Sequence, residues 1–125
     1  GSDIDPACVS LSETNARRAG VDGDIVFTCA DARMFRSPIE GAKGTIVCNP
    51  PYGERMGDRE SASILGRDVG KTLAENVPSW QLYFISDNME FERDFGRRAD
   101  KKRPLYNGML KCALYQYFRP EFKKD

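Results

Sequence analysis

The sequence predicts an α/β fold with a mostly parallel sheet, and three observations support this prediction. Short β-branched or aromatic runs alternate with helical stretches, a pattern that favours parallel strands with helices on both faces of the sheet. An Asn-Gly pair at 107–108 separates two strand-like runs near the end of the chain, which is typical of an antiparallel hairpin. A length of 125 residues is usual for one domain. We therefore expect one α/β unit that closes with an antiparallel hairpin.

The first element expected is a helix over about residues 6–19. Asp5 and Pro6 supply an N-cap acid followed by proline at the first helical position, and Gly20 lies where a C-terminal cap would. β-Branched and aromatic residues then predict a strand at 24–29. These two elements form the first strand-and-helix alternation of the chain.

Two apolar runs, at 44–48 and 80–85, predict further strands that are buried on both faces. The first run stops at a proline pair, which cannot donate hydrogen bonds to a strand ladder. A helix over about 60–75 is expected between them, and a short helix within 88–96 follows the second. We found no internal repeat, linker or low-complexity segment.

Composition excludes several classes of function. The chain has no histidine, which removes the commonest general base, the commonest zinc ligand and every Ser-His or Cys-His nucleophile. Its four cysteines lack CxxC spacing and lie mostly in apolar segments, so we expect reduced core thiols and no metal or disulfide. Basic residues (19) balance acidic ones (19), so any attraction for nucleic acid must be local. Without a membrane-length apolar run or a recognisable signal peptide, the expected location is cytoplasmic.

Polar side chains follow the predicted strands at the points where the strands end. Asp3, Asp31 and Asn49 each lie at or just after such an end, and ligands of open α/β sheets bind beyond it, so one crevice could collect all three. Asp3 would accept hydrogen bonds from two ribose hydroxyls, and Ile4 would pack on an adenine. A solvated strand-end acid is the alternative for Asp3. Asp5 is assigned to the helix N-cap.

The segment Asn49-Pro50-Pro51-Tyr52 suggests a specific chemistry. The lone pair of an exocyclic purine amine is delocalised into the ring, so its nitrogen is a poor nucleophile. The Asn49 side-chain oxygen and the next backbone carbonyl could accept both amine hydrogens and align the nitrogen with an electrophilic methyl group. The prolines would hold these carbonyls rigidly, and Tyr52 would stack on an unstacked base. A merely rigid turn is the alternative, but the position directly after a buried strand favours catalysis.

Together these motifs resemble the class I S-adenosylmethionine-dependent methyltransferases, and more closely the putative RNA methylase family that includes bacterial 23S ribosomal RNA guanine-N2 methyltransferases. The resemblance runs nearly end to end. Residues 1–6 are similar to the family's second motif, which implies that Asp3 binds the cofactor ribose. Residues 30–32 are similar to the third, which implies that Asp31 and Ala32 lie near the cofactor adenine. Residues 49–57 are similar to the fourth, with the extension of the ribosomal RNA enzymes, and Asn49 is also counted among the cofactor contacts.

The resemblance implies a Rossmann-like methyltransferase sheet from which the first strand and its glycine-rich motif are absent. We therefore expect residues 1–125 to be the C-terminal portion of a catalytic domain, with a gap in the sheet and little activity in isolation. It also implies S-adenosyl-L-methionine as the cofactor and guanine N2 of 23S ribosomal RNA as the methyl acceptor. Family members carry an upstream RNA-binding region with a THUMP domain, to which nothing here corresponds.

Other functions remain open. The chain could instead methylate adenine N6 in DNA or RNA, or the side-chain amide of a protein glutamine. All of these substrates present a similar planar amine to the same loop. A non-catalytic fragment that binds RNA or a partner is an alternative from a different class, and the missing first motif supports it.

Charged and aromatic residues near the end of the chain permit two interpretations. Five basic residues around Asp100 could hold RNA phosphates, or they could protect an edge strand from aggregation: Arg97, Arg98, Lys101, Lys102 and Arg103. Arg55, after the predicted catalytic loop, could contact RNA or form a salt bridge. Three tyrosines are assigned to strand packing: Tyr106, Tyr115 and Tyr117.

Overall fold

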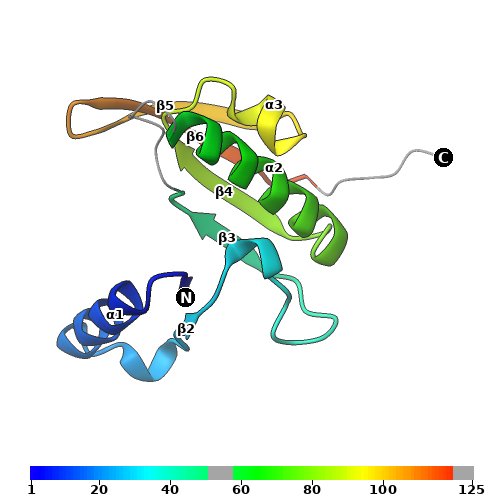
Figure 1. Ribbon diagram of the computed structural model, residues 1–125. Coiled ribbons are helices and arrows are strands. Elements are labelled where there is room, and N and C mark those ends of the chain that lie inside the picture. Colours follow the sequence, from blue (N-terminus) through cyan, green and yellow to red (C-terminus); the bar gives the residue numbers. More distant parts are fainter. Residues whose placement is uncertain (51–57, 120–125) are drawn as a thin grey trace. The chain divides into compact units, whose positions relative to one another are not determined.

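The computed structural model describes residues 1–50 and 58–119 (Figure 1). The chain forms two compact units, Gly1–Phe35 and Arg36–Asp125. The described strands form two separate sheets, one in each unit.

The first unit contains a two-stranded parallel sheet and one long helix. Its elements are β1 (Ser2–Asp3), α1 (Pro6–Ala19), the 3₁₀ turn η1 (Asp22–Asp24), β2 (Thr28–Cys29) and the 3₁₀ turn η2 (Ala32–Met34). The bounds of α1 confirm the predicted helix. The Asp5 carboxylate accepts a hydrogen bond from the Ala7 N–H at 2.9 Å, and Gly20 ends the helix in the left-handed conformation with φ 74°.

The strand predicted at 24–29 is much shorter in the structure. Only Thr28 and Cys29 pair, with Ser2 and Asp3 of β1, while residues 22–24 form a 3₁₀ turn. The backbone immediately before β2 is held differently, because the Gly1 amino group donates to the Val26 carbonyl at 2.7 Å. A β-branched run forms a strand only where a neighbouring strand supplies N–H and carbonyl groups to pair with. β1 has two residues, so β2 also has two.

The second unit contains a mixed four-stranded sheet, ordered β3-β4-β6-β5. Its elements are β3 (Thr45–Cys48), α2 (Asp58–Asn76), β4 (Gln81–Ser86), α3 (Phe91–Phe95), β5 (Lys101–Asn107) and β6 (Leu110–Tyr117). β3 and β4 are parallel, whereas β4–β6 and β5–β6 are antiparallel, so this sheet is mixed where a mostly parallel one was expected. The predicted strands, helices and closing hairpin of this half are confirmed in outline.

The hairpin turn lies one residue later than the Asn-Gly pair. Asn107 still pairs with Leu110, so the two central residues are Gly108 and Met109. Gly108 has φ 65°, and Met109 has no positive φ. Glycine at the first central position is typical of a type II′ turn, whose twist matches that of the flanking strands.

The core of the second unit is an aromatic cluster on one face of the sheet. Phe84 of β4 contacts Phe91 and Phe95 of α3. Phe91 stacks on Tyr115 of β6, and Phe95 contacts Tyr117 of the same strand with tilted rings. The ring centroids of these pairs lie 4.7–5.3 Å apart. Helix α2 adds buried Val69 and Leu73, and Val77, directly after the helix, is buried as well. Both helices of this unit thus pack on the same face of its sheet.

The two buried tyrosines confirm the packing role predicted for them. The Tyr115 hydroxyl donates to the Asn88 carbonyl at 3.0 Å and the Tyr117 hydroxyl donates to the Arg97 carbonyl at 2.9 Å. Burial raises the pKa of both phenols, most strongly that of Tyr117. The prediction for Tyr106 is wrong, because 71% of this residue is exposed.

Two other burial predictions are also wrong. β3 is not buried on both faces: Val47 is 76% exposed, because it points away from the face that α2 and α3 cover. All four cysteines are free thiols, but Cys112 alone is buried, while Cys8 and Cys29 are exposed and Cys48 is half-buried. Apolar runs in the sequence therefore do not reveal which face another element covers.

Gly70 marks a close approach between α2 and α3. A Cβ atom at this position would overlap the Phe95 carbonyl oxygen. We expect Gly70→Ala to lower the free energy of unfolding by about 1–3 kcal/mol, as overpacking does. Urea unfolding followed by circular dichroism measures this change.

Gly66→Ala, one turn earlier in the same helix, is the matched control. A Cβ there meets only the Asp94 Cβ, at an ordinary 3.8 Å. Since alanine favours a helix over glycine by up to about 1 kcal/mol, this variant should be as stable as the parent or more so. Equal loss of stability in the two variants would contradict the inferred contact.

Candidate functional site

Asn49 lies directly after β3, as predicted, and its side chain is exposed. Because β3 and β4 run parallel, with Cys48 opposite Phe84, the chain leaves both strands at the same edge of the sheet. Asn49 and Pro50 therefore begin a loop at this carboxyl edge. Pro51, Tyr52 and Arg55 lie outside the described residues, and the catalytic roles of the segment stay predictions.

The strand that carries Asn49 is fixed at its start by Trp80. The indole ring lies so close to Gly44 that a Cβ there would come within 2.7 Å of it. The indole N–H also donates to the Ala42 carbonyl at 2.9 Å, and the Gln81 N–H donates to the Gly44 carbonyl at 3.1 Å. These contacts tie the beginning of β3 to the beginning of β4 and so set where Asn49 emerges.

A hydrogen-bonded cluster holds the loop after β4 at the same carboxyl edge. The Asn88 side-chain amide donates to buried Asp94 at 2.9 Å, and the Asn88 N–H donates to the Ser86 hydroxyl at 3.1 Å. Tyr115 adds the contact to the Asn88 carbonyl. This cluster was missed in the sequence, although polar residues after an apolar strand were the signal that selected Asn49.

Asp3 ends β1, as predicted, and one of its carboxylate oxygens accepts the Asp5 N–H at 2.9 Å. The Asp3 carbonyl accepts the Ala30 N–H at 3.0 Å, which ties this strand end to the residues after β2. Ile4 is 64% exposed. An exposed carboxylate and an exposed apolar side chain thus lie side by side in the sequence at one strand end.

Asp31 has strong local partners. It caps the turn Ala32–Met34 by accepting the Arg33 N–H at 2.9 Å, and it forms an ion pair with the Arg33 guanidinium at 2.6 Å. The hydrogen bonds from Arg33 lower the pKa of the Asp31 carboxyl group. The carboxylate form is thus favoured in the folded chain, and its stabilising contribution is lost as the pH falls through this lowered pKa. A purely structural role suffices to explain this geometry.

Asp3 and Asp31 belong to the first unit and Asn49 belongs to the second. Within the first unit, Asp3 and Asp31 lie at the same end of the parallel pair β1–β2. That one crevice collects all three residues stays a prediction.

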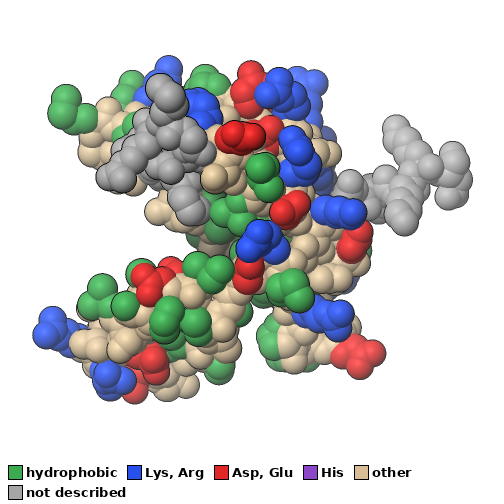
Figure 2. Space-filling model, in the orientation of Figure 1, with side chains coloured by type: hydrophobic (Ala, Val, Ile, Leu, Met, Phe, Trp, Pro, Cys, Tyr) green, Lys and Arg blue, Asp and Glu red, His purple; other side chains and the backbone are tan. Residues whose placement is uncertain are grey.

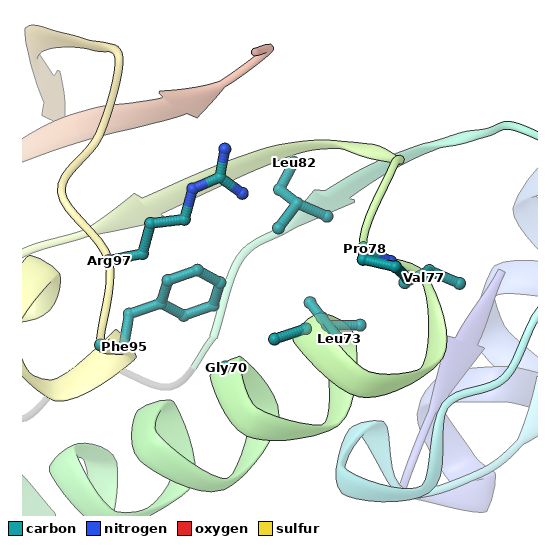
Figure 3. Close-up of a pocket in the computed structure, with 9 residues that line it drawn as sticks. Gly70, Leu73, Val77, Pro78, Leu82, Phe95 and Arg97 are labelled. Carbon is teal, nitrogen blue, oxygen red and sulfur yellow. The ribbon is translucent and has the colours of Figure 1, made fainter. Parts of the chain in front are cut away.

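A small cavity in the second unit lies away from this edge (Figure 3). It is lined by the second half of α2, the segment that leads into β4, and the end of α3, including Leu73, Val77, Leu82, Phe95 and Arg97. Its volume is about 40 Å³. Ligand sites usually occupy roughly 300 Å³ or more, so this cavity can hold a few waters but no nucleotide-sized cofactor.

Several charges of the predicted basic cluster have structural partners. Lys102 pairs with Glu92 at 2.9 Å, and Arg97 lies over the Tyr117 ring at 5.1 Å. The Asp100 carboxylate accepts the N–H groups of Phe118 and Arg119. On the face shown in Figure 2, Lys and Arg side chains alternate with Asp and Glu around α3. β5 is an edge strand, so edge protection accounts for part of the cluster.

Among the described residues, no group of three or more acidic, cysteine or histidine side chains is arranged to hold a metal ion. In the same part of the chain, no helix combines the length and the apolar character that crossing a membrane would need.

The chain is similar to methyltransferases. It is 38% identical to "Putative RNA methyltransferase YpsC" of Bacillus subtilis (strain 168), over 98% of this chain and 32% of the relative. It is also 38% identical to ribosomal RNA large subunit methyltransferase K/L of Shewanella amazonensis, over 94% of this chain and 16% of the relative. The chain thus spans a third or less of the length of these relatives.

A solved structure and a family model agree with these relatives. The crystal structure of SMU.472, described as "a putative methyltransferase complexed with SAH", matches with a TM-score of 0.88 and 36% identity, over 98% of this chain and 32% of that one. Residues 1–116 match the model of the family described as "RMKL-like, methyltransferase domain". The chain therefore belongs to the RMKL-like methyltransferase domain family.

Proposed function

We propose that this chain forms the amine-recognising part of an S-adenosyl-L-methionine-dependent RNA methyltransferase. The observation that carries the proposal is the position of Asn49 and Pro50, directly at the carboxyl end of β3, in a chain of the RMKL-like methyltransferase family. The names of two relatives, an RNA methyltransferase and a ribosomal RNA methyltransferase, support RNA as the substrate class.

In this proposal, Asn49 acts on the substrate amine. Its side-chain oxygen and the Pro50 carbonyl accept the two amine hydrogens, which turns the nitrogen lone pair out of conjugation and toward the methyl donor. The nitrogen then forms a bond to the methyl carbon as the bond between that carbon and sulfur breaks, and the surplus proton leaves to solvent. Trp80 and the Asn88 cluster keep the two loops at this edge in place.

The cofactor proposed here supplies the methyl group. Asp3 and Ile4 suit its nucleoside part, because an exposed strand-end carboxylate accepts from a ribose diol and an exposed apolar side chain packs on adenine. The complex of SMU.472 with SAH supports this choice. Asp31 and Ala32 would lie near the adenine, although Arg33 already engages the Asp31 carboxylate.

Guanine N2 of large-subunit ribosomal RNA is the methyl acceptor that we propose. Adenine N6 and protein glutamine present similar amines, and the Asn49 loop would accept them by the same chemistry. Incubation of the full-length protein with unmodified 23S ribosomal RNA and labelled cofactor, followed by nucleoside mass spectrometry, separates these outcomes. Labelled N2-methylguanosine supports the proposal, and label in N6-methyladenosine or in protein contradicts it.

We also propose that residues 1–125 are the C-terminal portion of a catalytic domain. The share of the relatives that the chain covers, a third or less of their length, supports this. In this proposal, an upstream strand with a glycine-rich turn holds the methionine part of the cofactor. The relatives are long enough to contain such a segment and an RNA-binding region.

Replacing Asn49 tests the catalytic role. In the full-length protein, Asn49→Ala should lower kcat about 100- to 1,000-fold, as loss of one preorganised polar group at a reacting centre does. Cofactor affinity should change much less, and calorimetry measures it. Asn15→Ala, which removes an exposed amide from α1, is the control. Near-parental kcat in Asn49→Ala would refute the assignment.

Asp3→Asn tests the ribose contact. Asparagine keeps an oxygen for the Asp5 N–H but loses the charge, so local structure should persist. The dissociation constant for the cofactor should rise about 10- to 100-fold, since hydrogen bonds to charged groups contribute about 1.5–3 kcal/mol. Calorimetry with S-adenosylhomocysteine measures it. Unchanged affinity would identify Asp3 as a solvated strand-end acid.

The partial-domain proposal predicts that isolated residues 1–125 bind the cofactor poorly. Because the segment proposed to hold the methionine part would be missing, calorimetry should detect no tight stoichiometric binding, whereas the full-length protein should bind. Circular dichroism of the same sample verifies that helices are present. Tight binding by the isolated chain would overturn the proposal.

A further inference from the structure

The β5–β6 hairpin extends past the carboxyl end of β4. Pairing between β4 and β6 stops at Ser86 and Ala113, whereas β6 begins at Leu110 and the turn lies at Gly108 and Met109. At about 3.4 Å per residue, the turn lies roughly 13 Å beyond the last β4 pair. Figure 1 shows the hairpin passing the arrowheads of β3 and β4.

The projecting part lies on the side of the sheet where the Asn49 loop begins. β6 is antiparallel to β4, so the start of β6 adjoins the carboxyl end of β4, and β3 ends at that same edge. All of these elements belong to the second unit, so their arrangement is internal to one compact body. The hairpin therefore projects from the edge of the sheet at which Asn49 follows β3.

The surface of this projection combines an aromatic ring with positive charge. Tyr106 is 71% exposed and pairs across the hairpin with exposed Lys111, so the two side chains share one face. Met109 is fully exposed at the turn. In Figure 2, hydrophobic side chains are visible at the tip of the hairpin. Exposed aromatic rings beside basic side chains are typical of proteins that bind single-stranded nucleic acid.

Edge protection does not explain this composition. Charged residues and proline on the outer strand discourage pairing with other chains, and Lys101 and Pro104 supply them where β5 flanks the body of the sheet. The exposed Tyr106 ring and the exposed Met109 side chain at the tip would instead favour association with other molecules. Edge protection thus leaves the composition of the tip unexplained, whereas a bound partner would account for both side chains.

We propose that the hairpin tip, residues Tyr106–Lys111, binds the RNA strand that flanks the target nucleotide, with Tyr106 stacking on a base and Lys111 contacting a phosphate. The inference rests on the proposed function. Adjacent strands are about 4.8 Å apart, so β5 lies roughly 14 Å across the sheet from β3. That separation is too large for Tyr106 to touch the base held at Asn49, so the contact is to neighbouring nucleotides.

Filter binding of the full-length protein to unmodified 23S ribosomal RNA, over a series of salt concentrations, tests the proposal. Tyr106→Ala should weaken binding about 5- to 150-fold, the range for loss of one stacked base, while Tyr106→Phe should remain within about twofold of the parent. Lys111→Ala should reduce the slope of log affinity against log salt by about 0.7, the value for one phosphate contact on a single strand. Lys71→Ala, an exposed lysine on α2, is the matched control and should leave the slope unchanged.

Cofactor affinity and thermal stability should match the parent in all four variants. Parental RNA affinity in Tyr106→Ala overturns the inference, as does a loss of stability without a loss of RNA binding, which would show that another part of the protein covers the ring. If the parent itself neither binds nor methylates the RNA, the proposed function fails. If the parent is active and Asn49→Ala is not, but the tip variants bind normally, the hairpin inference alone fails.

Discussion

The aromatic cluster of the second unit is the interaction on which the rest of that unit depends. Five rings from β4, α3 and β6 meet on one face of the sheet, and each such ring pair contributes about 0.5–1.5 kcal/mol beyond simple burial. The short helix α3 has five residues and could not be stable alone. Its position follows from Phe91 and Phe95, and the position of α2 follows from the contact of Gly70 with Phe95.

The same aromatic cluster is connected to the carboxyl edge of the sheet by the hydroxyl group of Tyr115. Buried phenols need hydrogen-bond partners, and Tyr115 finds one in the Asn88 carbonyl at the carboxyl edge of the sheet. Asn88 in turn satisfies Asp94, a carboxylate that is 6% exposed. The conformation of the loop after β4 therefore depends on the packing of the core, because Tyr115 and Asp94 both bond to Asn88. Preorganised loops are what the proposed amine chemistry needs, because its acceptors must be in place before reaction.

The hairpin β5–β6 divides into two halves with different roles. Beside β4, it supplies Tyr115 and Tyr117 to the core, and Lys102 anchors it to Glu92 of α3. Beyond β4, nothing among the described residues covers Tyr106. Tyr115 and Tyr117 are thus buried whereas Tyr106 is exposed, although all three lie in strands of the same hairpin. The difference arises because Tyr106 lies beyond the end of the neighbouring strand β4.

Local patterns in the sequence were enough to predict the ends of helix α1 and the place of Asn49 after a strand. Asp5, Pro6 and Gly20 set the ends of α1, because caps act through backbone groups a few residues away. The same holds for Asn49 after β3, whose place follows from an apolar run and a proline stop. Which faces are covered could be learned only from the folded chain, as the exposure of Val47 and Tyr106 and the hydrogen bonds of Asn88 show. These features depend on contacts between residues far apart in the chain, and a local pattern cannot specify which distant element reaches a given face.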